Sequence, residues 1–182
     1  SSFVAVYHKI CSEWNIVPEK SVETAVYDIG RAVFKSKEEY EKKGLIDGVS
    51  ETLEFLLGKK DDLYLVTRGD EEVQRAKIDG LNIKRFIRYE NINIVNYDKK
   101  PVFSKIVENG KSGVIIVEDS LKIVNDATCP PLDLKAVYIP LKGGTWKHEN
   151  SGNGFKNKKN VLVLEKIVDI VQKYDDIWSW NF

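Results

Sequence analysis

The sequence contains no methionine and only two cysteines among its 182 residues. Because even position 1 is not methionine, we expect the natural polypeptide to begin upstream of Ser1. Cys11 and Cys129 lie far apart and lack the close spacing of a metal site. We therefore expect both to be reduced thiols in a cytoplasmic protein.

Long apolar runs and an excess of charge of one sign are also missing. No stretch approaches the roughly 18 apolar residues that a membrane-spanning helix needs, and the N-terminus lacks the basic and then apolar pattern of a secretion signal. Lys and Arg together number 28, as do Asp and Glu. A chain without net charge has no overall attraction for nucleic acid or anionic membranes, so we expect neither as a partner.

The apolar residues that are present follow two different patterns. Residues 1–45 carry them at helical spacing only, whereas from residue 46 short apolar runs alternate with helical segments. The predicted strands are 63–66, 92–95, 114–117, 136–139 and 161–164. This alternation predicts an α/β protein with a doubly wound parallel sheet over residues 46–182. Residues 143–159, with His148 and Glu149, are rich in Gly, Asn and Lys and predict a loop.

Two acidic residues follow the most apolar of these strands. Residues 113–120 read Gly-Val-Ile-Ile-Val-Glu-Asp-Ser, which places Glu118 and Asp119 where a buried strand ends. Ligands of open α/β sheets bind beyond the carboxyl ends of the strands. Two neighbouring carboxylates there suit a cation with oxygen ligands. The alternative is that Asp119 and Ser120 cap the next helix.

Two other segments place polar residues near strand ends. Residues 63–70 read Leu-Tyr-Leu-Val-Thr-Arg-Gly-Asp, and a hydroxyl with backbone amides at such a position suits a phosphate group. Thr67 is the hydroxyl donor and Arg68 its neighbour; the alternative is a helix cap at Thr67 or Asp70. Lys100 precedes a proline that predicts the first turn of a helix, where its charge would offset phosphate. A solvated pair of lysines is the alternative.

Hydroxyl, lysine and acid pair, in this order, resemble the second, third and fourth motifs of the haloacid dehalogenase superfamily. The similarity covers about residues 45–140, and the Glu-Asp form of the fourth motif is similar to that of the phosphatase and phosphomutase branch. Residues 1–45 resemble the α-helical cap of that family, and 46–182 its Rossmann-like core. The resemblance implies a Mg²⁺-dependent phosphatase of a small phosphorylated metabolite, present as a monomer or homodimer.

The resemblance also implies roles for the motif residues. Thr67 and Arg68 would bind the phosphoryl oxygens, Lys100 would stabilise their charge, and Asp119 with Glu118 would hold Mg²⁺. Thr67 and Lys100 are thus the expected catalytic residues. Hydrolytic dehalogenation is the less favoured chemistry, because it attacks carbon and has no use for a Mg²⁺ site.

The family's first motif, Asp-x-Asp at a strand end, is absent from the sequence. In the family it supplies the aspartate that becomes phosphorylated. The nearest match is Asp28, but its apolar neighbours recur at helical spacing. We therefore expect the motif and its strand upstream of Ser1. The alternative is a non-catalytic module of the same fold that binds phosphate or metal.

Overall fold

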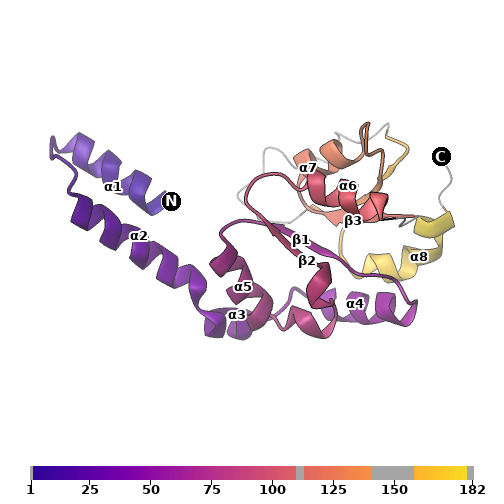
Figure 1. The fold of residues 1–182 in the computed structure, drawn as a ribbon. Coiled ribbons are helices and arrows are strands. Elements are labelled where there is room, and N and C mark those ends of the chain that lie inside the picture. The colour runs from indigo at the N-terminus through magenta and orange to yellow at the C-terminus, as the bar shows by residue number, and fades with distance from the viewer. Residues whose placement is uncertain (1, 110–112, 141–157, 180–182) are drawn as a thin grey trace. The chain divides into compact units, whose positions relative to one another are not determined.

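The computed structural model describes residues 2–109, 113–140 and 158–179 (Figure 1). Most of the predicted loop, including His148 and Glu149, lies outside these residues. The helices are α1 (Ser2–Glu13), α2 (Lys20–Lys35), α3 (Lys37–Lys43), α4 (Val49–Gly58), α5 (Glu71–Gly80), α6 (Lys100–Glu108), α7 (Leu121–Ala127) and α8 (Asp169–Ser179), with short 3-10 turns η1 (Ile83–Arg85) and η2 (Tyr89–Asn91). The strands are β1 (Leu65–Arg68), β2 (Ile92–Val95), β3 (Ile115–Glu118), β4 (Lys135–Tyr138) and β5 (Val161–Val163).

The chain forms two compact units. Ser1–Gly44 and Gly69–Arg85 make up the first, and Leu45–Arg68 and Phe86–Phe182 make up the second. The first unit is helical as far as it is described, and it includes α5, which packs against α2 and α3. Its assignment as a cap remains a prediction. None of the helices in the described residues is long and apolar enough to cross a lipid bilayer.

Local sequence signals define the helix ends in the first unit. Ser36 Oγ accepts a hydrogen bond from the Glu39 N–H at 3.3 Å, which caps the start of α3. At its other end Gly44, with a φ of 65°, donates its N–H to the carbonyl of Tyr40. Asp28 lies on α2, so the helical spacing around it is confirmed as helix.

Long-range contacts hold α2 and α5 together. Arg31 on α2 donates from Nη2 to Asp70 Oδ2 at 3.1 Å and to Glu72 Oε2 at 2.9 Å. Asp70 also caps α5, because its Oδ1 accepts a hydrogen bond from the Val73 N–H at 3.2 Å. The Asp70 carboxylate thus caps the start of α5 and also links α5 to α2.

The strands of the second unit form two parallel sheets. β1 pairs with β2, and β4 lies between β3 and β5. Parallel strands joined by helices confirm the predicted α/β class. β1 lies two residues further along the chain than predicted, since Thr67 pairs with Ile94 and Arg68 with Val95. Thr67 is therefore inside the strand, because backbone pairing continues past the last apolar residue.

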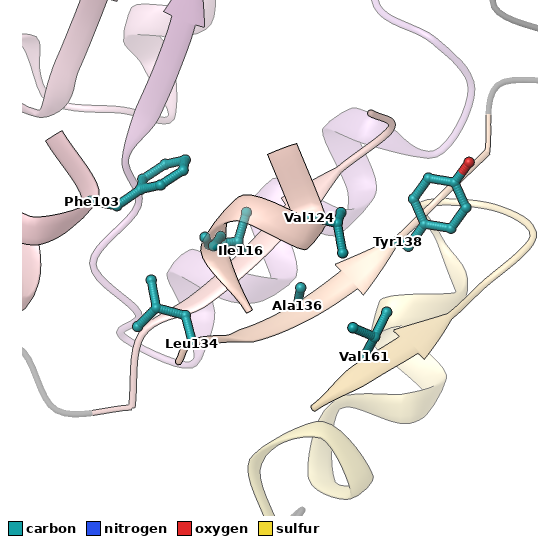
Figure 2. Packing of buried hydrophobic residues seen from close by; sticks show 8 residues of the cluster. Phe103, Ile116, Val124, Leu134, Ala136, Tyr138 and Val161 are labelled. Atoms are coloured by element: carbon teal, nitrogen blue, oxygen red, sulfur yellow. The ribbon is translucent and has the colours of Figure 1, made fainter. Parts of the chain in front are cut away.

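The main core of this unit surrounds β4. Ala136 and Tyr138 on β4 pack with Phe103, Ile116, Val124, Leu134 and Val161, which come from the flanking helices, strands and loops (Figure 2). A second cluster joins Val137 to Leu164, Ile170 and Ile177. Side chains alternate between the two faces of a strand. β4 therefore has a buried apolar cluster on each face, as expected for the middle strand of a parallel sheet.

Candidate active site

A lysine and a glutamate form a shielded ion pair where β3 ends. Lys99 donates from Nζ to Glu118 Oε2 at 2.6 Å, and their side chains are only 13% and 11% exposed. Glu118 is the last residue of β3, and Lys99 directly precedes α6. A charge-assisted hydrogen bond of this length between shielded groups is among the stronger polar contacts in proteins. It fixes the acid at the carboxyl edge of the sheet.

Burial raises the pKa of the Glu118 carboxyl. The hydrogen bond and positive charge of Lys99 lower it, whereas the hydrogen bond and negative charge of Asp119 raise it. The net shift is upward, because desolvation and the neighbouring acid outweigh the lysine. The surroundings of Glu118 thus disfavour its charged form, and a nearby cation would favour that form.

Tyr138 is the next group at this edge. It lies opposite Glu118 in the pairing of β3 with β4, and the Glu118 carbonyl accepts a hydrogen bond from the Ile139 N–H at 3.0 Å. Burial raises the pKa of the Tyr138 hydroxyl, and the negative charge of Asp119 raises it further. Asp119 itself is exposed, so its carboxylate faces solvent beside a buried phenol.

The structure brings Lys99, and not Lys100, to the acid pair. Lys100 is the first residue of α6, and its Nζ lies 3.6 Å from Asp126 Oδ1 on α7 with 42% of its side chain exposed. Successive residues of a helix point about 100° apart, so two adjacent lysines at a helix start reach different neighbours. Sequence reasoning named Lys100 because it precedes the proline, and it missed both Lys99 and Tyr138.

The remaining predicted residues lie on the other sheet. Thr67 and Arg68 are the last two residues of β1, half-buried and exposed respectively. The helix cap suggested for this segment is formed by Asp70, as described above. The two sheets thus each carry part of the predicted site: β1 holds the hydroxyl, and the end of β3 holds the acids and the lysine contact.

The acid pair fits a divalent metal ion in its donor chemistry. Mg²⁺ commonly binds through one or two carboxylates, with water and substrate phosphate completing its coordination. Glu118 and Asp119 provide two neighbouring carboxylates, and a bound cation would favour their charged forms. Among the described residues no group of three or more His, Cys, Asp or Glu gathers to hold a metal.

A cavity of about 370 Å³ begins beside Glu118 and extends between the two sheets. Residues 63–66 and 113–118 line it, together with apolar side chains from α4, α6 and α8. Both segments are consecutive runs, whereas one face of a strand presents only every second residue. The cavity therefore borders the edges of β1 and β3, and not a single face of either strand.

Comparison with known proteins gives matches among solved structures. No protein-family profile matches the chain. No curated protein sequence matches it either. A haloacid dehalogenase-like family hydrolase from Xanthomonas campestris is similar over 97% of this chain and 72% of its own, with a TM-score of 0.65 and 14% identity. A haloacid dehalogenase-like hydrolase from Burkholderia xenovorans is similar over 73% of this chain and 59% of its own, with a TM-score of 0.57 and 15% identity.

Helices that alternate with parallel strands define an α/β protein. The acid pair lies where a strand ends, which is the edge at which such sheets generally bind ligands. The similarity to the two solved structures identifies the fold. This chain has the haloacid dehalogenase-like fold, as its motifs predicted.

Proposed function

We propose that the protein is a Mg²⁺-dependent phosphatase that hydrolyses the phosphate ester of a small metabolite. The main support is the cluster at the end of β3, where Lys99 contacts Glu118 at 2.6 Å and Asp119 follows. Phosphoryl transfer spreads negative charge over the equatorial oxygens, and a lysine beside metal-binding carboxylates would stabilise that charge. The two similar hydrolase structures support the same class of reaction.

Each polar residue of the site would have a separate task. Thr67 and Arg68 would donate hydrogen bonds to phosphoryl oxygens, and Lys99 would hold Glu118 in place while offering its charge to the phosphate. Lys100 keeps the predicted role only if it turns away from Asp126. Glu118 and Asp119 would hold Mg²⁺. When bound, the ion would stabilise negative charge on the oxygens of the transferred phosphoryl group.

The attacking group would be an aspartate outside residues 1–182. Its carboxylate oxygen would bond to phosphorus while the bond from phosphorus to the alcohol oxygen breaks, and water would then release inorganic phosphate from the acyl phosphate. We propose a small phosphorylated metabolite as the substrate, a monomer or homodimer as the active form, and the cytoplasm as the location. Two free cysteine thiols support that location.

The test is hydrolysis of p-nitrophenyl phosphate by the complete polypeptide. Activity should require Mg²⁺ and should fall at least about 100-fold in Asp119→Asn, because the variant loses a charged metal ligand. Asp126→Asn is the matched control, since Asp126 lies on α7 and contacts Lys100 and Lys122 there. It should retain activity within about threefold.

The competing function is a non-catalytic module that binds phosphate or metal. The missing motif favours it, because the sequence of residues 1–182 contains no Asp-x-Asp. Absence of turnover by the folded, Mg²⁺-loaded complete polypeptide, over a panel of phosphate esters, would establish the module and exclude the phosphatase.

A further inference from the structure

The first two helices form an antiparallel hairpin with many apolar side chains open to solvent. α1 packs against α2 (Figure 1), and a Cβ at Gly30, near the end of α2, would lie 2.9 Å from the ring of Phe3 at the start of α1. Further along α1, His8 Nε2 lies 3.6 Å from Glu23 Oε2 in the first turn of α2. The exposed apolar residues of the hairpin helices include Phe3 (44%), Val6 (57%), Ile10 (49%), Trp14 (73%), Val22 (39%) and Ile29 (65%).

These six side chains lie on one side of the hairpin and form what we call the hairpin face. Cys11 is 4% exposed and Gly30 is buried, so each marks the side of its helix that contacts the other helix. The residues just before them, Ile10 and Ile29, point about 100° away from those sides. Because the helices are antiparallel, this equal rotation places Ile10 and Ile29 on the same side of the hairpin. Spacings of three, four or seven residues place the other four with them.

The hairpin face is large enough for a stable protein contact. Exposures of 39–73%, on side chains that each offer about 150–250 Å², leave an apolar surface on the order of 600 Å². The largest apolar patch of a typical monomer is about 300–600 Å² and is often functional. A standard interface buries about 800 Å² on each partner, of which somewhat more than half is apolar. The hairpin face therefore supplies the apolar area that such an interface needs.

Opposite charges lie at the two edges of the hairpin face. Lys9 and Asp28 each come one residue before an isoleucine of the face and two residues before the buried contact residue of their helix. This position is about 160° from the contacting side, so both lie on outer edges. Two hairpins that face each other about a two-fold axis parallel to the helices place α1 of one copy over α2 of the other. The edge with Lys9 then runs along the partner edge with Asp28, and the charges are complementary.

We propose that the hairpin face is a homodimer interface, through which two copies of the chain pack α1 and α2 into a four-helix bundle. A surface that pairs with a second copy of itself meets the requirement of two-fold symmetry. In this arrangement each helix is antiparallel to both of its neighbours, which is a common topology of four-helix bundles. The proposal concerns the contact between copies and does not rest on phosphatase activity.

Sedimentation equilibrium of the complete polypeptide at micromolar concentrations tests the proposal. We expect the wild type to be a dimer. Ile29→Glu should weaken dimerisation at least about 100-fold, because it buries a charge in both copies. Ile46→Glu is the matched control, since Ile46 is 66% exposed and lies outside the hairpin, and it should change dimerisation by no more than about threefold. Both isoleucines are open to solvent in a single copy, so both variants should keep the wild-type helix content by circular dichroism.

Trp14 reports the same contact without an added charge. The emission of the wild type minus that of Trp14→Phe should shift to shorter wavelength over the concentrations at which the mass doubles, because the exposed indole becomes buried. A monomeric wild type would overturn the proposal, as would a dimer that Ile29→Glu leaves intact or that Ile46→Glu weakens equally. Loss of helix content in Ile29→Glu alone would show that the hairpin face is covered within one copy, which would also overturn the proposal.

Discussion

Lys99 Nζ lies 2.6 Å from Glu118 Oε2, and this contact joins the start of α6 to the end of β3. Both groups are nearly shielded from water, so each depends on the other to offset the cost of burying its charge. Most other ion pairs in the described residues lie on open surface, where solvent weakens them. The contact is therefore both a structural anchor and the basis of the proposed site.

Lys99→Met should destabilise the protein much more than Lys100→Met. The first substitution leaves Glu118 buried without its partner, which we expect to cost about 3 kcal/mol of unfolding free energy. The second breaks an exposed contact of 3.6 Å, which is worth roughly 0–1 kcal/mol. Urea unfolding at pH 7 measures both values. Equal losses for the two variants would show that Lys99 is not the lysine that supports the acid pair.

Mg²⁺ should raise the thermal stability of the protein through the acid pair. A ligand that binds only the folded state stabilises it, and 10 mM MgCl₂ acting on a site of millimolar affinity should raise the Tm by roughly 3 °C. Differential scanning calorimetry measures the shift. Asp119→Asn should abolish it and Asp126→Asn should keep it. A shift that survives in Asp119→Asn would place the metal elsewhere.

Tyr174 should stabilise the protein at neutral pH but not at high pH. Its hydroxyl lies 3.0 Å from Asp61 Oδ1, and burial, followed by the contact with Asp61, raises its pKa. A raised pKa means that the stabilisation is complete below the unfolded value of about 10 and is lost as pH rises through the folded value. Tyr174→Phe should therefore cost about 1 kcal/mol at pH 8, and the difference should vanish at higher pH.

Urea unfolding between pH 8 and pH 11 measures this difference. Tyr97→Phe is the control, since Tyr97 is 86% exposed and its loss should have little effect at either pH. If the difference between wild type and Tyr174→Phe stayed constant across the range, the hydroxyl would not be the stabilising group.

Gly80→Ala should destabilise the first unit, although alanine normally favours helices over glycine. A Cβ at Gly80 would lie 2.5 Å from the Lys37 carbonyl oxygen and 2.7 Å from Tyr40 Cβ, so α3 and α5 would have to separate. We expect a cost of about 1–3 kcal/mol in unfolding free energy.

Gly58, the last residue of α4, has no neighbouring atom within 4 Å of a built Cβ. Gly58→Ala should be neutral or should stabilise by up to about 1 kcal/mol, and a similar cost at both glycines would contradict the packing argument.

Several elements could be predicted from the sequence because their signals are local. β2 has the predicted bounds, and Asp28 lies in a helix, as the helical spacing of its apolar neighbours predicted. The strand of residues 114–117 could also be predicted, since four β-branched residues in a row favour a buried strand. Its prediction placed the two acids that follow at the end of a strand. The resemblance in motif order then predicted the fold that the similar structures share.

Other features depended on contacts between distant residues. No local pattern distinguishes Lys99 from Lys100, because the direction of each side chain depends on how α6 meets β3 and α7. The packing of α5 with α2 depends on Arg31, which is 39 residues away from Asp70. The extension of β1 through Thr67 depends on pairing with β2.

The sequence by itself therefore determined the elements, their α/β class and the identity of the acid pair, since periodicity and residue type act over a few neighbouring positions. Only the tertiary structure decided which lysine meets Glu118, that Tyr138 lies opposite Glu118, and where β1 and β3 leave a cavity between their edges. Such relationships arise when segments far apart in the chain are packed together, and no short stretch of sequence encodes that packing.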